Sequence, residues 1–202
     1  MNRSRVSILA LALLIALAVA AMGQPGHADP PQGQGKGKGP AINANAKFVS
    51  PVIKGYGPVV PMPDAEELPK KGTKVVFDVT AVNKDATKPL PGLERAAVLL
   101  NLAGAAGLKP GDIEVVIVLH GDATSAALDD AAYRTLTGKD HPHAELMKRL
   151  KEAGVKFLVC GQSLERKKLD VKKVRAEVKV AASAVSAVIN YQLRGYAFIP
   201  AH

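Results

Sequence analysis

IEVVIVLHG, residues 113–121, is the stretch that decides the fold. Its residues up to Leu119 are almost all apolar and branched, which is the pattern of a strand buried on both faces of a parallel sheet. A second run, VKFLVCGQS at residues 155–163, has the same form and also ends in a reactive side chain and a glycine. A helix is expected between the two runs, because Pro142 suits a first helical residue and Gly154 suits a helix end. Strands that alternate with helices in this way predict an α/β domain built on a parallel sheet.

The same alternation continues on both sides of these runs and places the domain at residues 72–202. Short apolar runs predict a mostly parallel, five-stranded sheet. The expected strands are Lys74–Thr80, Ile113–Leu119, Val155–Cys160, Val178–Val180 and Tyr196–Ile199. The expected helices are Leu93–Ala106, a short one within Ala123–Leu136, Pro142–Gly154, one capped by Ser163 and ending at Lys168, and one capped by Ser183 and ending at Arg194. Aromatic residues make up only 4% of the chain, so the core is expected to consist of Val, Leu, Ala and Ile.

The residues before the domain differ from it in composition. Residues 1–28 have the features of an export signal, with basic residues ahead of the apolar run Val6–Met22 and small residues that suit cleavage after about residue 21 or 28. An uncleaved anchor is the alternative, since the run approaches the ~20 residues that span a bilayer. The composition predicts a Gly/Pro-rich flexible linker at residues 23–40 and an extended Pro-rich arm at residues 41–71, laid on the domain or on a neighbouring subunit. We therefore expect an exported protein, periplasmic or secreted, with no membrane segment after cleavage.

The composition argues against a nucleic-acid-binding protein and against a protein with an internal disulfide. The chain is basic, with a pI near 9.7, but it has no tryptophan and no recognised nucleic-acid motif, so no nucleic-acid partner is expected. Cys160 is the only cysteine, which rules out an internal disulfide. Composition alone favours a small buried hydrophobe at this position.

The ends of the two defining strands nevertheless point to a reactive site. In an open parallel sheet, ligands collect beyond the carboxyl ends of the strands, and His120 and Cys160 both leave their strands at that edge. A thiol at the start of a helix meets the positive end of the helix dipole, which favours the nucleophilic thiolate. The alternatives are a structural histidine and simple helix capping by Gln162 and Ser163. The candidate catalytic residues are Cys160 and His120, and the candidate substrate-binding residues are Gly121, Gly161, Gln162 and Ser163.

Two further features admit a functional and a structural interpretation. Between Arg166 and Lys179 there are seven basic and two acidic side chains, which could favour a thiolate and attract sulfur oxyanions or could form a solvated face. The pair His141 and His143 could bind a metal with His120 or Cys160, but the segment also makes a good helix start. We expect neither a metal nor a cofactor.

Four motifs in this order resemble the DsrE/DsrF-like family over residues 73–200. They are Val118-Leu119-His120-Gly121, the segment Ala144–Val155, Val159-Cys160-Gly161-Gln162-Ser163-Leu164, and the segment Ser183–Ala197. The stretch Ser50–Asp64 is similar to the leader of exported members. The resemblance implies a flavodoxin-like three-layer sandwich, assembly as a trimer or hexamer, and a sulfur-relay role in which Cys160 accepts sulfane sulfur as a persulfide.

Two hypotheses of different classes follow. The first is an exported sulfur-handling protein, a sulfurtransferase or sulfur carrier, in which Cys160 forms a persulfide or a mixed disulfide. Its partners would be a sulfur donor or acceptor protein or a small sulfur anion. The second is a non-catalytic oligomeric binding or scaffold protein, in which Cys160 is merely packed and the arm joins subunits.

Overall fold

A computed structural model describes residues 46–201. The expected signal and linker lie outside the described residues. The sheet has the strand order β4-β3-β2-β1-β5, and every neighbouring pair is parallel. This confirms the α/β expectation, with all five strands parallel. The strands are β1 (Lys74–Val79), β2 (Glu114–Leu119), β3 (Lys156–Cys160), β4 (Val178–Ala181) and β5 (Ala197–Ala201).

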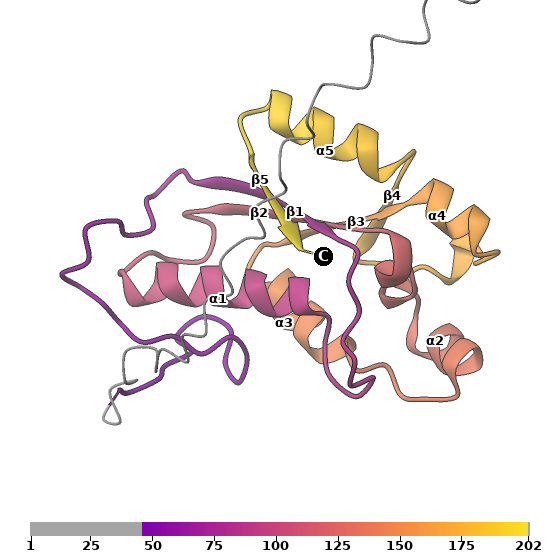
Figure 1. The fold of residues 1–202 in the computed structure, drawn as a ribbon, viewed down its shortest axis with the longest axis horizontal. Coiled ribbons are helices and arrows are strands. Elements are labelled where there is room, and N and C mark those ends of the chain that lie inside the picture. Colours follow the sequence, from indigo (N-terminus) through magenta and orange to yellow (C-terminus); the bar gives the residue numbers. More distant parts are fainter. Residues whose placement is uncertain (1–45, 202) are drawn as a thin grey trace, which may run out of the picture. The chain divides into compact units, whose positions relative to one another are not determined.

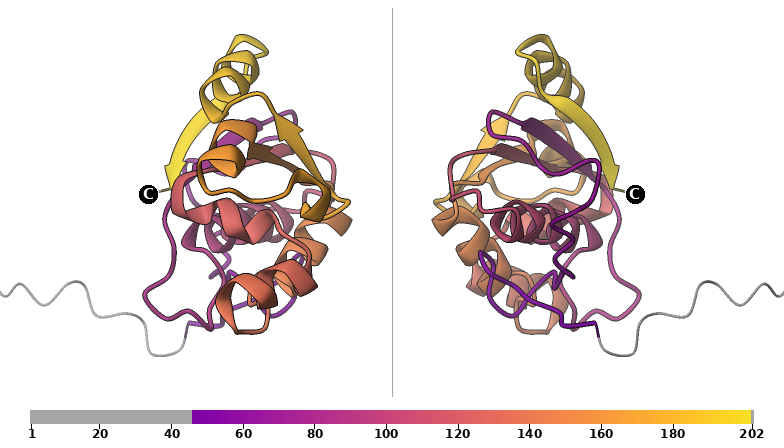
Figure 2. Two further views of the ribbon diagram at one scale, coloured as in Figure 1. Left: turned by 90° about the vertical axis from the view of Figure 1, so that its right-hand side faces the viewer. Right: turned by 90° about the vertical axis from the view of Figure 1, so that its left-hand side faces the viewer.

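Helices cover both faces of the sheet and complete a flavodoxin-like three-layer sandwich. α1 (Pro91–Ala105) and α3 (Ala144–Glu152) lie on one side, and α5 (Ala184–Leu193) lies on the other (Figure 1). The two side views show α5 standing by itself on its side of the sheet (Figure 2). The remaining elements are the 3-10 helices η1 (Gly121–Ala127) and η2 (Val171–Lys173) and the helices α2 (Asp130–Thr137) and α4 (Gly161–Arg166).

One expected helix is present and the expected start of another was wrong, both for local reasons. The short helix expected within Ala123–Leu136 is α2, which follows η1 and starts where the Asp129 side chain accepts a hydrogen bond from the N–H of Ala132. α4 begins at Gly161, directly after β3, so Ser163 lies inside the helix and Cys160 takes the N-cap position. The cap of α5 is confirmed, since Ser183 Oγ accepts from the N–H of Ser186 at 3.0 Å.

The two faces of the sheet have cores of different size. Alternate residues of each strand point to opposite faces, so Ile117 and Phe157 face α1 and α3, whereas Val116 and Val118 face α5. Among the described residues, 26 buried side chains form the core on the α1 side and eight form the core under α5. The second and smaller core includes Cys160.

The described part of the arm packs against α1 of its own domain. The buried side chain of Asn101 accepts hydrogen bonds from the N–H groups of Val52 and Ile53, at 3.0 and 2.8 Å. Its amide donates to the carbonyl oxygens of Tyr56 and Gly57, both at 2.8 Å. Ile53 is 1% exposed and belongs to the larger core. The arm is therefore part of the domain's core over this stretch.

Candidate functional site

The carboxyl edge of the sheet brings the two reactive side chains side by side. β2 and β3 are neighbours, and their last paired residues are Leu119 and Val159. His120 and Cys160 follow these two residues directly, and the backbone of His120 remains extended. Both side chains therefore lie on the face covered by α5, on adjacent strands and at the same level. The strand order thus places the two candidate catalytic residues together.

Cys160 lies where the N-termini of two helices converge. It is 5% exposed, occupies the N-cap position of α4 and packs in the small core beside Ala184, the first residue of α5. Burial raises the pKa of the thiol, but the hydroxyl of Ser163 and the backbone N–H groups of Ala184, Ser163 and Gln162 lower it more. The pKa of Cys160 is therefore below its ordinary value. Donors aimed at the sulfur favour the thiolate, which is the nucleophilic form.

The glycine after the thiol lies in a closely packed position. A Cβ on Gly161 would lie 3.0 Å from the carbonyl oxygen of Ala181 and 3.4 Å from a methyl group of Val180. Glycine here lets α4 start against the end of β4, which keeps the N-terminus of α4 at the sulfur. Gly161 thus supports the site by its small size.

The other expected substrate-binding residues have distinct positions. Ser163 acts on the sulfur itself, as described above, and so has a partner other than a substrate. Gln162 is exposed and its amide donates to the carbonyl oxygen of Ala182 at 3.4 Å, beside the start of α5. Gly121 has a φ of 55°, a left-handed conformation that favours glycine, and it turns the chain from His120 into η1.

Sequence reasoning missed Asp78, the closest polar partner of His120. Its Oδ1 lies 2.7 Å from His120 Nε2, and the two side chains are 15% and 26% exposed. The signal in the sequence was a single carboxylate in the apolar strand KVVFDV, and its partner became evident only with the strand register. The edge therefore holds a Cys, a His and an Asp on three consecutive strands.

The basic segment after Cys160 divides into paired and exposed residues. Lys167 reaches back to Asp122, with Nζ 3.2 Å from Oδ1, and links α4 to η1 beside the site. Arg175 is committed to Asp130 and Glu177, both at 2.8 Å. The remaining basic residues of the segment are all solvent-exposed: Arg166, Lys168, Lys172, Lys173 and Lys179.

The second histidine pair lies apart from the thiol, around Tyr133. His141 Nε2 donates to the carbonyl oxygen of Leu128 at 3.1 Å, and its Nδ1 accepts from the N–H of His143 at 3.3 Å. His143 is 6% exposed, and its buried Nδ1 has no hydrogen-bond partner. Over residues 46–201, no group of three or more His, Cys, Asp or Glu side chains is placed to hold a metal ion. With both nitrogens of His141 engaged, this cluster is a packing feature.

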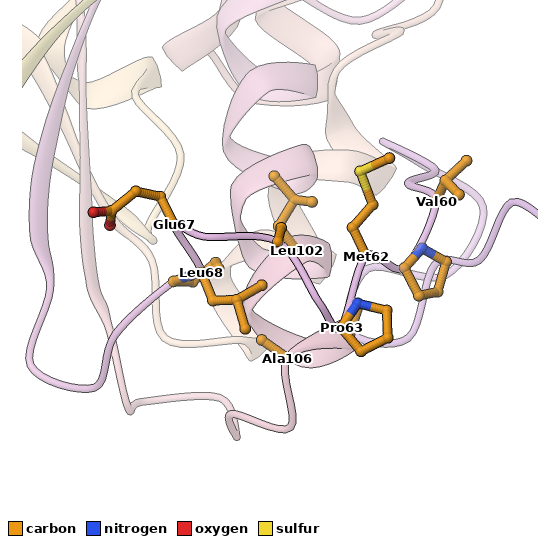
Figure 3. Close-up of a pocket in the computed structure, with 11 residues that line it drawn as sticks. Val60, Met62, Pro63, Glu67, Leu68, Leu102 and Ala106 are labelled. Carbon is orange, nitrogen blue, oxygen red and sulfur yellow. The ribbon is translucent and has the colours of Figure 1, made fainter. Parts of the chain in front are cut away.

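An apolar groove of about 320 Å³ lies away from the thiol, between the arm and α1. Met62, Pro63 and Leu68 of the arm and Leu102 and Ala106 of α1 line it (Figure 3). It contains none of the expected site residues. In the described part of the chain, no helix combines the length and the apolar character needed to cross a membrane.

The fold and the edge together define a class of protein: a three-layer parallel α/β domain with one cysteine at the carboxyl ends of its strands. The chain belongs to the DsrE/DsrF-like family, whose sequence profile matches residues 74–201. This confirms the resemblance seen in the motifs. Membership of this family is associated with sulfur relay.

A comparison with solved structures finds, among others, two chains that are matched over nearly their whole length. MTH1491 from Methanobacterium thermoautotrophicum, described as a protein of unknown function, is 20% identical with a TM-score of 0.47, over 63% of this chain and 98% of that chain. The YchN protein from E. coli is 11% identical with a TM-score of 0.43, over 63% and 98% of the two chains. A comparison with curated proteins finds no match.

Proposed function

We propose that the protein is an exported sulfur carrier in which Cys160 accepts a sulfane sulfur as a persulfide. The observation that carries the proposal is the position of Cys160 at the carboxyl end of β3, at the N-cap of α4 and beside the first residue of α5. Hydrogen bonds from Ser163 and from the backbone N–H groups of Gln162 and Ala184 lower the pKa of the thiol there. These donors favour the thiolate, which is the form that attacks a sulfane sulfur. Family membership supports the choice of sulfur chemistry over other thiol reactions.

Thiosulfate illustrates a balanced form of the reaction. The Cys160 thiolate attacks the sulfane sulfur, a new S–S bond forms, and the bond to the sulfonate sulfur breaks. Sulfite leaves with the bonding electron pair, and Cys160 retains one added sulfur atom. No external oxidant or reductant is consumed. Transfer to an acceptor thiolate follows the same course and regenerates Cys160.

Mass spectrometry of the intact protein tests the proposal. After incubation with thiosulfate or polysulfide, the wild type should gain the mass of one sulfur atom, and dithiothreitol should remove it. Cys160→Ser is the matched control and should gain nothing. A wild type without an adduct, or an equal adduct on Cys160→Ser, would refute the proposal.

The burial of Cys160 favours a second candidate, a scaffold in which the thiol only packs. A sulfur that is 5% exposed needs some opening before a reagent reaches it. Iodoacetamide separates the two candidates, because a carrier should be alkylated in the native state at neutral pH and a packed thiol only after denaturation.

Self-association and export complete the proposal. We propose a homo-oligomer formed through α5, since Val185, Ile189 and Leu193 are 70%, 50% and 81% exposed, and the helix carries no charged side chain. Light scattering should show an oligomer for the wild type and a smaller species for Leu193→Asp. Export rests on the signal-like residues 1–28, and N-terminal sequencing of the mature protein should begin near residue 22 or 29.

A further inference from the structure

Asp78 occupies a position where an apolar residue would cost less. It lies in β1 between the buried residues Phe77 and Val79, and it shares its face with the fully buried Val76. A carboxylate in such surroundings loses hydration, and an ion pair seldom recovers more than that loss. Its partner is His120 on the next strand, 2.7 Å away. Packing alone therefore does not account for Asp78.

The register places this pair in line with the thiol. Asp78 is paired with Val118 and therefore lies two residues before the level of His120 along the strands. Cys160 lies level with His120, on the other side of β2. The carboxylate, the imidazole and the thiol thus follow one another across β1, β2 and β3 on the same face. An imidazole held from one side by a carboxylate presents its other nitrogen for proton exchange.

We propose that Asp78 is a positioning residue for sulfur transfer, which fixes His120 through Nε2 so that Nδ1 can act on the group that leaves the sulfur donor at Cys160. The inference rests on the proposed function. The contacts assign different roles to two sets of residues. Ser163 and the helix N–H groups already stabilise the thiolate, so we assign the Asp78–His120 pair to the leaving group.

The proton balance with thiosulfate is simple. The thiolate forms its bond to the sulfane sulfur while the bond to sulfite breaks, and the imidazolium of His120 gives its Nδ1 proton to the departing sulfite. The products are the Cys160 persulfide anion, hydrogen sulfite and a neutral imidazole, which regains a proton from solvent. Asp78 remains a carboxylate throughout and stabilises the charge of the imidazolium.

The test compares Asp78→Asn with a control at the opposite edge. Glu114→Gln is matched, because Glu114 is a partly exposed carboxylate of β2 at the amino edge, bonded to Tyr196 and Lys74. For each variant, the rate of adduct formation with thiosulfate is measured across neutral pH, and alkylation by iodoacetamide is measured in parallel. Asp78→Asn should slow adduct formation by about 100-fold and flatten its pH profile, with alkylation changed by less than about twofold. Glu114→Gln should change neither rate, and Asp78→Glu should restore part of the loss.

The outcomes separate this inference from the proposed function. A wild type without an adduct refutes both, whereas a normal adduct rate in Asp78→Asn refutes only the role of Asp78. An equal loss of alkylation in Asp78→Asn would indicate a distorted thiol and would also overturn the role. Should Asp78→Asn fail to fold, the imidazole ¹⁵N shifts of wild-type His120 decide: the neutral ring should carry its proton on Nε2, and a proton on Nδ1 overturns the proposal.

Discussion

The two faces of the sheet perform different tasks. The face toward α1 and α3 is apolar throughout and is extended by the arm, with 26 buried residues among those described. The face under α5 has eight, and it carries the thiol and the Asp78–His120 pair. One face supplies most of the stability, so the other can tolerate a buried thiol and a half-buried ion pair. The predictions below test that division.

Adjacent residues of β3 provide the most direct test. Phe157 is 1% exposed in the larger core, whereas Leu158 points to the α5 face and is only partly buried. Phe157→Ala should lower the free energy of unfolding by about 4 kcal/mol, and Leu158→Ala by about 1–2 kcal/mol. Urea denaturation followed by circular dichroism measures both. Equal losses would show that the two faces contribute equally.

The next prediction concerns the connection of the arm to the larger core. Asn101→Leu should cost about 3 kcal/mol, because the change leaves the backbone groups of the arm at Val52, Ile53, Tyr56 and Gly57 without their partner. Limited proteolysis should then cleave the variant within residues 46–71 and should leave the wild type intact there. Asn190→Leu, on α5, is the control, and resistance of the Asn101 variant to proteolysis would contradict this account.

His143, directly before α3, extends the comparison of the two faces to charge. On the larger side, burial and the neighbouring His141 lower the pKa of His143 from 6.5 to about 4. The unfolded chain therefore takes up a proton at higher pH than the folded chain, and stability falls as the pH drops from 6.5 toward 4, by at most about 3 kcal/mol. His143→Phe should reduce this dependence in denaturation measured at several pH values. An unchanged pH dependence in that variant would show that other groups cause the acid sensitivity.

The two faces also differ in how far the sequence predicts them. Branched apolar runs ending in His120 and Cys160 were enough to predict a parallel sheet with both residues at one edge, because burial on both faces leaves no alternation in the pattern. Asp78 was not predicted, since its role depends on which strand lies beside β1. The start of α4 was misplaced because Ser163 resembles a cap, while the chain in fact passes from β3 into the helix without a linker. Docking of the arm depends on Asn101, which in the sequence is the single polar residue of the otherwise apolar stretch Ala96–Ala105.

The smallest expected change in stability falls on the α5 face, at the group that lowers the pKa of Cys160 most. Ser163→Ala removes the hydroxyl that bonds the sulfur, so the pKa of the thiol should rise and alkylation by iodoacetamide should move to higher pH. Unfolding should change by less than about 1 kcal/mol, because Ser163 is partly exposed. Gln162→Ala is the matched control: its side chain bonds Ala182 and its N–H remains, so the alkylation profile should stay in place. A shift of equal size in both variants would mean that the local helix start, and not the hydroxyl, controls the thiol. A shift in Ser163→Ala alone would show that the reactivity of this face can be tuned almost without cost to the fold.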